Sequence, residues 1–214
     1  MAPIIEFLAR AKIKSVSFLE KIKARLSPAL PAAEWLVIGL GNPGAKYENT
    51  RHNVGYLSLD MLIDAHSPQP LTPIRGLKVA STPLPHSALA LRSTTYMNNS
   101  GEAVAPLAEK LGIPADHIIV VHDELDLPAG TVRLKKGGNE NGHNGLKSLT
   151  AELGTRDYLR VRIGISRAPA GMAVPDYVLE PVAGAQPGIE LAAEAVMLIL
   201  EHGLATAQNT VHAK

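Results

Sequence analysis

Residues suited to acid–base chemistry occur in a glycine-rich stretch that follows the apolar segment 35–40. This stretch carries Asn42, Tyr47 and His52. A helix is expected to begin just before His52, which would then stand in its first turn. The helix dipole disfavours a charged imidazolium there and keeps the ring able to accept a proton. His52 is therefore a candidate general base, with a surface or capping histidine as the alternative.

The same stretch matches the glycine pattern of dinucleotide-binding loops, because residues 39–44 read Gly-Leu-Gly-Asn-Pro-Gly. The rest of the loop does not fit that function. Pro43 removes a backbone N–H donor and disfavours the α conformation at Asn42. The acid that would bind a ribose should follow a second strand, whereas Asp60 and Asp64 fall within the predicted helix. We therefore expect no nucleotide cofactor.

The elements that must position these residues alternate between strands and helices. Strands are predicted at 35–40, 77–82, 88–93, 117–122, 131–134 and 159–166, and helices at 50–65, 100–111, 143–153 and 188–203. The pattern predicts a single α/β domain with a twisted, mostly parallel mixed sheet and helices on both faces. The Pro-, Gly- and Ala-rich stretch 167–188 is compatible with a mobile lid or with a plain surface loop.

Residues 1–33 are expected to form a basic amphipathic helical extension before the domain at 34–214. They contain six basic and two acidic residues among apolar residues at helical spacing. Such a segment is typical of a membrane-surface helix, an organellar targeting sequence, a docking arm or a helix packed on its own domain. Its charges argue against stable membrane insertion. We therefore predict a cytoplasmic location, or an organellar one if this segment is a targeting sequence.

Composition excludes several kinds of site. The 214 residues include no cysteine, which rules out disulfides, thiolate zinc sites and a cysteine nucleophile. The net charge of +1 gives no argument for a nucleic-acid partner. Charge distribution does, because residues 131–170 carry eight basic and three acidic side chains. Such a basic segment is typical of phosphate binding that is largely blind to sequence.

Polar side chains, mostly amides, gather just after the predicted strands, where open α/β sheets bind their ligands. They lie in segments 94–101, 123–126 and 137–145. Capping and turn roles are the alternative for about half of them. In particular, Asn99 with Glu102 three residues later is expected to form a helix-capping pair.

Three hydrolytic arrangements compete for these residues. A metallohydrolase would use His122, Asp123, Glu124 and His143, but the sequence has no H-E-x-x-H pair. A serine nucleophile would require a G-x-S-x-G elbow, which is also absent. The third arrangement is direct attack by water, with a histidine as base, an acid that orients it and amides that bind the carbonyl oxygen. This chemistry suffices for an ester.

Five blocks in this sequence resemble bacterial-type peptidyl-tRNA hydrolases over about residues 35 to 205. The blocks are 39–44 with 50–53, 96–98 with 100–101, 122–128, 142–145 and 162–165. The resemblance implies hydrolysis of the ester that joins a peptide, or an N-blocked amino acid, to the 3′ ribose of tRNA. Free tRNA then returns to translation, as in ribosome rescue. It also implies a monomer with no metal and no cofactor.

The resemblance further implies roles for the residues around the ester. His52 would be the general base that activates water, and Asp123 would orient it and stabilise its charged form. Asn42 would lie against the substrate, where blocked and free aminoacyl-tRNAs are distinguished. Asn98 and Asn144 would hydrogen-bond the peptide and the attacked region.

Other matched positions imply contacts with the rest of the substrate. Met97 belongs to the same block as Asn98 and is expected to contact the substrate. Tyr47 and Tyr96 match positions that contact the tRNA end, in keeping with base stacking on aromatic rings. Lys135 and Arg162 match positions that grip the 5′ phosphate of the tRNA.

Three features depart from the family pattern. Glu140 places a negative charge near the proposed phosphate track, Asn99 stands where an apolar residue is common, and residues 1–33 have no counterpart in the usual short form. Two functions from other classes remain as alternatives. One is an RNA-binding protein on the same fold that has lost hydrolysis, and the other is a Rossmann-type oxidoreductase.

Overall fold

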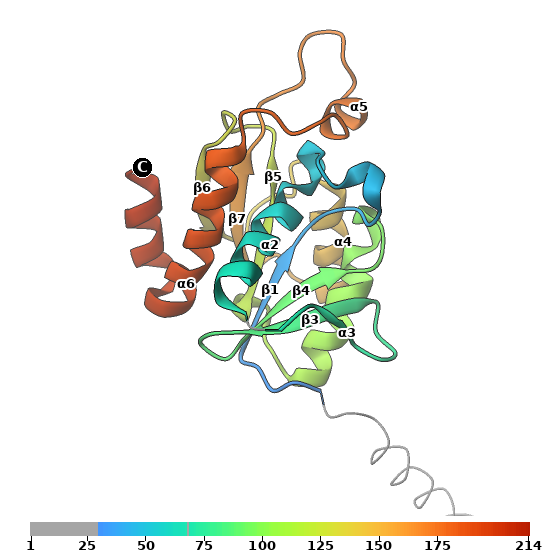
Figure 1. The fold of residues 1–214 in the computed structure, drawn as a ribbon, viewed down its shortest axis with the longest axis vertical. Coiled ribbons are helices and arrows are strands. Elements are labelled where there is room, and N and C mark those ends of the chain that lie inside the picture. Colours follow the sequence, from blue (N-terminus) through green and yellow to red (C-terminus); the bar gives the residue numbers. More distant parts are fainter. Residues whose placement is uncertain (1–29, 68) are drawn as a thin grey trace, which may run out of the picture. The chain divides into compact units, whose positions relative to one another are not determined.

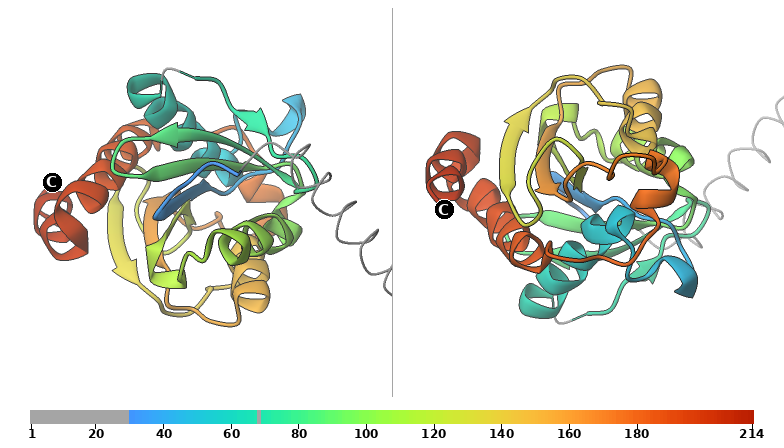
Figure 2. Two further views of the ribbon diagram at one scale, coloured as in Figure 1. Left: turned by 90° about the horizontal axis from the view of Figure 1, so that it is seen from below. Right: turned by 90° about the horizontal axis from the view of Figure 1, so that it is seen from above.

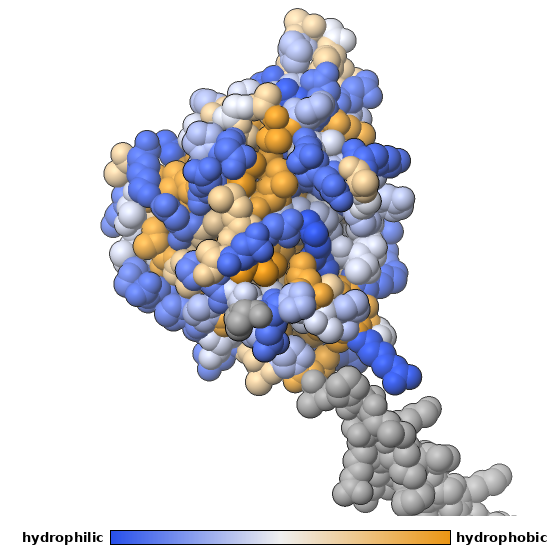
Figure 3. Space-filling view, viewed as in Figure 1, coloured by the Kyte–Doolittle hydropathy of each residue, from blue (hydrophilic) through white to orange (hydrophobic). Residues whose placement is uncertain are grey.

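The computed structural model describes residues 30–67 and 69–214 (Figure 1). Residues 32–214 form one compact unit. The helical extension predicted for residues 1–33 falls almost entirely outside the described residues. Among the helices in the described ranges, none is both long enough and apolar enough to cross a membrane. Hydrophilic residues are interspersed with apolar ones over the face shown in Figure 3.

The described residues form a seven-stranded mixed sheet with the order β2-β3-β4-β1-β5-β7-β6. The strands are β1 (Trp35–Gly39), β2 (Thr72–Pro73), β3 (Val79–Leu84), β4 (Ala88–Ser93), β5 (Ile118–Glu124), β6 (Val132–Lys136) and β7 (Leu159–Gly164). The four central strands β4, β1, β5 and β7 run parallel. Strand β6 at one edge and strands β2 and β3 at the other are antiparallel to their neighbours. The prediction of a mixed sheet is confirmed.

Helices cover both faces of this sheet. They are α2 (Val54–His66), α3 (Ser100–Leu111), α4 (Asn144–Leu153), α5 (Val174–Val178) and α6 (Gln186–His212). Helices α2 and α6 pack on one face, and α3 and α4 on the other (Figure 2). Short 3-10 turns lie at η1 (Ala45–Tyr47), η2 (Arg51–Asn53), η3 (Met97–Asn99) and η4 (Ala115–His117).

The central strands are buried on both faces, which explains their continuous apolar sequence. In β1, Leu36, Val37 and Ile38 have no exposed surface, and β5 is buried along its whole length. Helix α2 crosses this centre at very short range. A Cβ atom added at Gly55 would lie 2.4 Å from the carbonyl oxygen of Val121 in β5. This close approach brings the turn before α2 to the carboxyl end of β5.

Two predicted helices differ from the observed ones. The helix predicted at 50–65 begins as the 3-10 turn η2 and becomes α-helical only at Val54. The helix predicted at 188–203 runs on to His212, with Gly203 in a non-helical conformation (φ 78°, ψ 167°) that divides it into two segments. The second segment contacts the free edge of β6, where His212 Nε2 accepts a hydrogen bond from the Leu134 amide. Tertiary contact therefore continues the helix beyond the glycine.

Candidate active site

His52 and Asp123 meet at the carboxyl edge of the sheet. His52 belongs to η2, and Asp123 is the next-to-last residue of β5. His52 Nδ1 lies 2.9 Å from Asp123 Oδ1. Burial raises the pKa of Asp123, but the charges and hydrogen bonds of His52 and His143 outweigh it and hold that pKa well below its usual range. Because the ionised carboxylate only accepts hydrogen bonds, His52 carries its proton on Nδ1 and leaves Nε2 as a free acceptor.

Asp123, rather than a helix dipole, sets the basicity of His52. Burial lowers the pKa of His52, but the negative charge of Asp123 and its hydrogen bond more than compensate, so the pKa is raised above its ordinary value. The prediction that His52 stands in the first α-helical turn was wrong, because η2 precedes α2. His52 is thus a stronger base than a free imidazole.

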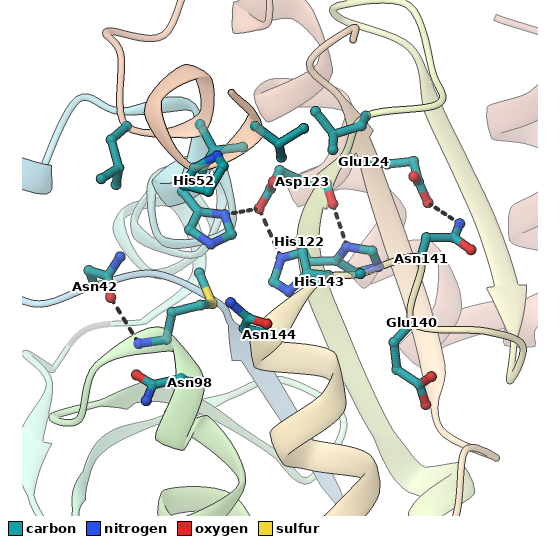
Figure 4. Close-up of a pocket in the computed structure, with 17 residues that line it drawn as sticks. Asn42, His52, Asn98, His122, Asp123, Glu124, Glu140, Asn141, His143 and Asn144 are labelled. Atoms are coloured by element: carbon teal, nitrogen blue, oxygen red, sulfur yellow. Dashed lines mark hydrogen bonds and ion pairs between the residues drawn. The ribbon is translucent and has the colours of Figure 1, made fainter. Parts of the chain in front are cut away.

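His143 is a third member of this cluster. From the sequence it was predicted only as a possible metal ligand. Its Nε2 lies 3.0 Å from Asp123 Oδ1, the same oxygen that His52 contacts. Its Nδ1 accepts hydrogen bonds from the amides of Gly145 and Leu146, so the ring caps helix α4. This fixes the proton on Nε2, and two imidazoles donate to one carboxylate oxygen (Figure 4). Its position at the start of the helix predicted at 143–153 was the signal for a capping role.

His122 contacts the backbone of Asp123 and not its carboxylate. Its side chain is 1% exposed, and Nδ1 donates a hydrogen bond of 2.6 Å to the backbone carbonyl of Asp123. Burial lowers the pKa of His122 well below its ordinary value, and the nearby His143 lowers it further. His122 therefore stays neutral and braces the end of β5.

The cluster also has the residue types of a metal site, since ligand atoms of His52, Asp123 and His143 lie within 4.8 Å of one another. The hydrogen bonds favour a different interpretation. With Nδ1 of His143 occupied by two backbone amides, its Nε2 carries a proton and has no lone pair for a metal. Both histidines therefore act as donors to Asp123.

Asn42 presents an amide donor to the same space. Its Oδ1 accepts a hydrogen bond of 2.8 Å from the backbone amide of Met97, which fixes the orientation of the carboxamide. Asn53 braces the backbone of Asn42 through two hydrogen bonds of 2.9 and 3.0 Å. The Nδ2 group is left to face the cavity (Figure 4). It can stabilise negative charge on a bound carbonyl oxygen.

A cavity of about 630 Å³ joins these groups. Six residues that the family resemblance predicts to be catalytic or substrate-binding line it, namely Asn42, His52, Met97, Asn98, Asp123 and Asn144. The amides of Asn98 and Asn144 are exposed. The opposite wall is apolar and consists of Leu125, Val174, Pro175, Val178 and Leu179. The structure therefore places the predicted base, its acid and the predicted amides in one cavity.

Tyr47 and Tyr96 lie outside the cavity lining but next to each other. Their ring centroids are 6.4 Å apart in an edge-to-face arrangement. Tyr96 is 56% exposed and directly precedes Met97 in the chain. An aromatic pair with one exposed ring beside the cavity can stack on nucleobases.

Lys135 lies on the edge strand β6 and Arg162 on its neighbour β7, and neither residue lines the cavity. Arg162 pairs across the strands with Arg133. Arg162 Nη1 is 3.8 Å from Glu124 Oε2. Burial lowers the pKa of Lys135, and the positive charge of Arg162 lowers it further. These basic side chains gather on one part of the sheet.

Two basic residues counted in the charge of segment 131–170 are occupied within the protein. Arg160 is fully buried and donates two hydrogen bonds of 2.7 Å to the backbone carbonyls of Gly138 and Asn139. Arg156 binds Glu140, with 2.7 Å between Nε and Oε1. The bond to Arg156 is the main reason that the pKa of Glu140 falls to about 2. The net charge of this segment therefore overstates the positive charge available to a ligand, and Glu140 is not a free negative charge.

The predicted roles of the other amides were only partly correct. Asn99 stands at the N-cap of α3, but its side chain forms no capping hydrogen bond, and Glu102 instead pairs with Lys78. Asn141 does adopt a left-handed turn conformation with φ 48°. Asn144 is no turn residue, because it begins α4 and faces the cavity.

An α/β fold whose cavity holds a carboxylate-bound histidine and amide donors has the residue types of a hydrolase active site. The sequence matches the peptidyl-tRNA hydrolase family over residues 36–214. The chain belongs to this enzyme family.

Individual relatives agree with this assignment. The peptidyl-tRNA hydrolase 2 of Corynebacterium glutamicum is 73% identical over 202 residues, which cover 94% of this chain and 99% of that protein. The peptidyl-tRNA hydrolase of Nocardia farcinica is 47% identical and covers 83% of this chain and 95% of its own. A crystal structure of peptidyl-tRNA hydrolase from Acinetobacter baumannii has a TM-score of 0.78 at 30% identity, covering 87% of this chain and 98% of that one.

The two kinds of match begin at different positions in the chain. The family match begins only at residue 36. The match to the Corynebacterium glutamicum protein covers 94% of this chain, which is more than residues 34–214 make up. It therefore reaches into residues 1–33, and part of that segment is shared with this relative.

Proposed function

We propose that this peptidyl-tRNA hydrolase cleaves its ester with a water molecule that His52 activates. His52 Nε2 takes a proton from water, and the oxygen attacks the ester carbonyl. The tetrahedral intermediate then expels the 3′ oxygen of the ribose, which receives the proton from His52. The products are a free carboxylic acid and tRNA. The free Nε2 beside a donor from Asn42 in one cavity is the observation that supports this proposal.

Asp123 and His143 prepare the base in this mechanism. Asp123 holds the tautomer of His52 and stabilises the imidazolium that forms in the transition state. The second donor, His143, helps to keep Asp123 ionised and directed at His52. A positioned base contributes roughly 10²–10⁴ in rate, and one oxyanion donor roughly 10²–10³. The cluster and Asn42 together can account for ester cleavage.

The cavity lining supports contacts with the peptide. Asn98 and Asn144 present exposed amides that can pair with peptide groups and with the attacked ester. Asn42 lies where an N-blocked residue would be distinguished from a free amine. Met97 supplies an apolar contact next to these amides.

The tRNA is proposed to bind outside the cavity. The pair of Tyr47 and the exposed Tyr96 would stack on bases of the acceptor end. Lys135 and Arg162 would hold the 5′ phosphate, with affinity that falls as salt rises. We further propose that the catalytic domain spans 34–214, that residues 1–33 are a basic extension, and that the enzyme is a cytoplasmic monomer without a metal.

The test is an assay of the full chain with N-acetyl-aminoacyl-tRNA and with the unblocked aminoacyl-tRNA. Release of the N-acetyl amino acid, with little release of the free one, is expected. Dialysis against a chelator should leave the rate unchanged. Binding of tRNA without any release would instead support the alternative of an RNA-binding protein that has lost hydrolysis. A rate that is lost with the chelator and restored by a divalent cation would contradict the metal-free mechanism.

A further inference from the structure

Arg51, the residue before His52, fastens the catalytic turn to the segment after α5. Its guanidinium lies 4.2 Å from the centre of the Tyr177 ring. Its Nη1 is 2.9 Å from Glu180 Oε2. The Arg51 side chain is 13% exposed and that of Glu180 is 42% exposed, so the guanidinium is largely buried while the carboxylate reaches solvent. The arginine thus holds both an aromatic face and a carboxylate at one place.

The backbones of the two segments pair at the same place. The amide of Arg51 donates to the carbonyl of Glu180 at 3.0 Å, and the amide of Val182 donates to the carbonyl of Asn49 at 2.7 Å. Thr50 forms an antiparallel β-bridge with Pro181. Residues separated by about 130 positions therefore form a short two-stranded contact. It lies directly before the base.

The same contact reaches the cavity wall and the sheet. The Tyr177 hydroxyl donates a hydrogen bond of 2.6 Å to the carbonyl of Ile165, just after β7. Val178 and Leu179, which follow Tyr177, line the cavity. Helix α5 packs against η2. Arg51 is thus the link between the catalytic turn and a segment that is itself anchored to the sheet.

We propose that Arg51 is a positioning residue that holds His52 in line with Asp123. The guanidinium fixes η2 from the side opposite the sheet, while the hydrogen bond to Asp123 fixes the ring from the sheet itself. Loss of the guanidinium would leave only the backbone pairing with residues 180–182 to hold that side of the turn. Since a misplacement of about 1 Å can cost on the order of 10² in rate, we expect Arg51→Gln to lower kcat by about 10- to 100-fold. KM should stay within about twofold, because Arg51 lines neither the cavity nor the basic strands.

A matched control exists within the chain. Arg92 also lies over a tyrosine ring, at 4.3 Å from the centre of Tyr56, and it also pairs with a carboxylate, at 2.8 Å from Asp60. These three residues do not line the cavity. Arg92→Gln therefore removes the same kind of interaction without touching η2. It should leave kcat and the pH dependence of the rate unchanged.

The decisive readout is the pH profile of kcat, measured with thermal unfolding for both variants. The titratable groups against the His52 ring are Asp123 from β5 and His143 at the N-cap of α4. If Arg51→Gln weakens the contact between His52 and Asp123, the acidic limb of the kcat profile moves to lower pH. Arg92→Gln should leave the limb in place. A limb at the wild-type position in Arg51→Gln overturns the proposal, whatever the value of kcat.

Two further variants guard against a folding defect. Glu180→Gln removes only the charge of the partner and should lower kcat in the same direction as Arg51→Gln, by less. Arg51→Lys keeps a cation that can reach Glu180, and it should restore part of the lost rate. If Arg51→Gln and Glu180→Gln both fold and neither differs from the wild type in kcat or in the position of the limb, Arg51 has no positioning role.

Discussion

The catalytic cavity and the basic part of β6 and β7 use their polar side chains in opposite ways. In the cavity, His52, Asp123 and His143 are bound to one another before any substrate enters, and only a few atoms remain free. On the basic strands, Lys135 and Arg162 lie together with no such closed set of partners. Fixed geometry suits bond cleavage, whereas a cluster of cations suits binding of a phosphate that any tRNA carries.

The difference predicts that mutations in the two regions separate kcat from KM. Changes in the cavity should lower kcat and leave tRNA binding intact. Changes on the basic strands should raise KM, alter its salt dependence and leave the chemical step intact. The four predictions below run from the largest expected effect to the smallest.

His52→Ala should lower kcat by at least about 10²-fold, because it removes the proton acceptor. Affinity for tRNA should persist, since the side chain does not belong to the basic strands. Single-turnover hydrolysis and tRNA binding, measured on the same preparation, check both statements. Unchanged turnover would falsify the assignment of His52 as the base.

Asp123→Asn should lower kcat by less than the loss of His52, because the imidazole remains but its orientation and tautomer are disturbed. The pH profile of kcat shows the direction in which the pKa of His52 shifts. Asp123 raises the pKa of His52, and the base must be neutral, so wild-type kcat falls as pH drops through that raised pKa. Without the negative charge the pKa of His52 falls, and the acidic limb moves to lower pH. A limb that stays fixed or moves upward contradicts the pairing.

His143→Gln should lower kcat by about tenfold. Asp123 then loses one of its two imidazole donors, and the glutamine side chain offers only a weaker amide donor in its place. The variant should also lose on the order of 1 kcal/mol of unfolding free energy, since His143 caps α4. Rates are compared well below the unfolding midpoint, with Thr155→Ala as a variant of similar burial outside the cavity. Wild-type kcat in a destabilised protein would make His143 a purely structural residue.

Arg162→Ala should raise KM and reduce the salt slope of binding by about one unit, with kcat unchanged. Arg156→Ala is the matched control, because it removes the same charge from the same segment, but one already bound to Glu140. Its effect on the salt slope should be smaller. Equal slopes for the wild type and Arg162→Ala would exclude Arg162 from the phosphate site.

The sequence predicted the pairing of His52 with Asp123 because family motifs and strand order are local properties. His52 follows a buried strand and Asp123 ends another, and parallel neighbours present their carboxyl ends at one edge of the sheet. The amides of Asn42, Asn98 and Asn144 were predicted for the same reason. The mixed sheet, the helices on both faces and the family followed from the same local patterns.

Tertiary structure alone decided which atoms of these residues are free. The proton of His143 is fixed by backbone amides of α4, and Arg51 finds its partners in a segment far along the chain. The charges of Arg156 and Arg160 are neutralised or buried by a neighbouring loop. Residue type determines what a side chain can do, but a hydrogen bond needs its partner within about 3 Å. Only the folded chain brings residues that are distant in sequence to that distance.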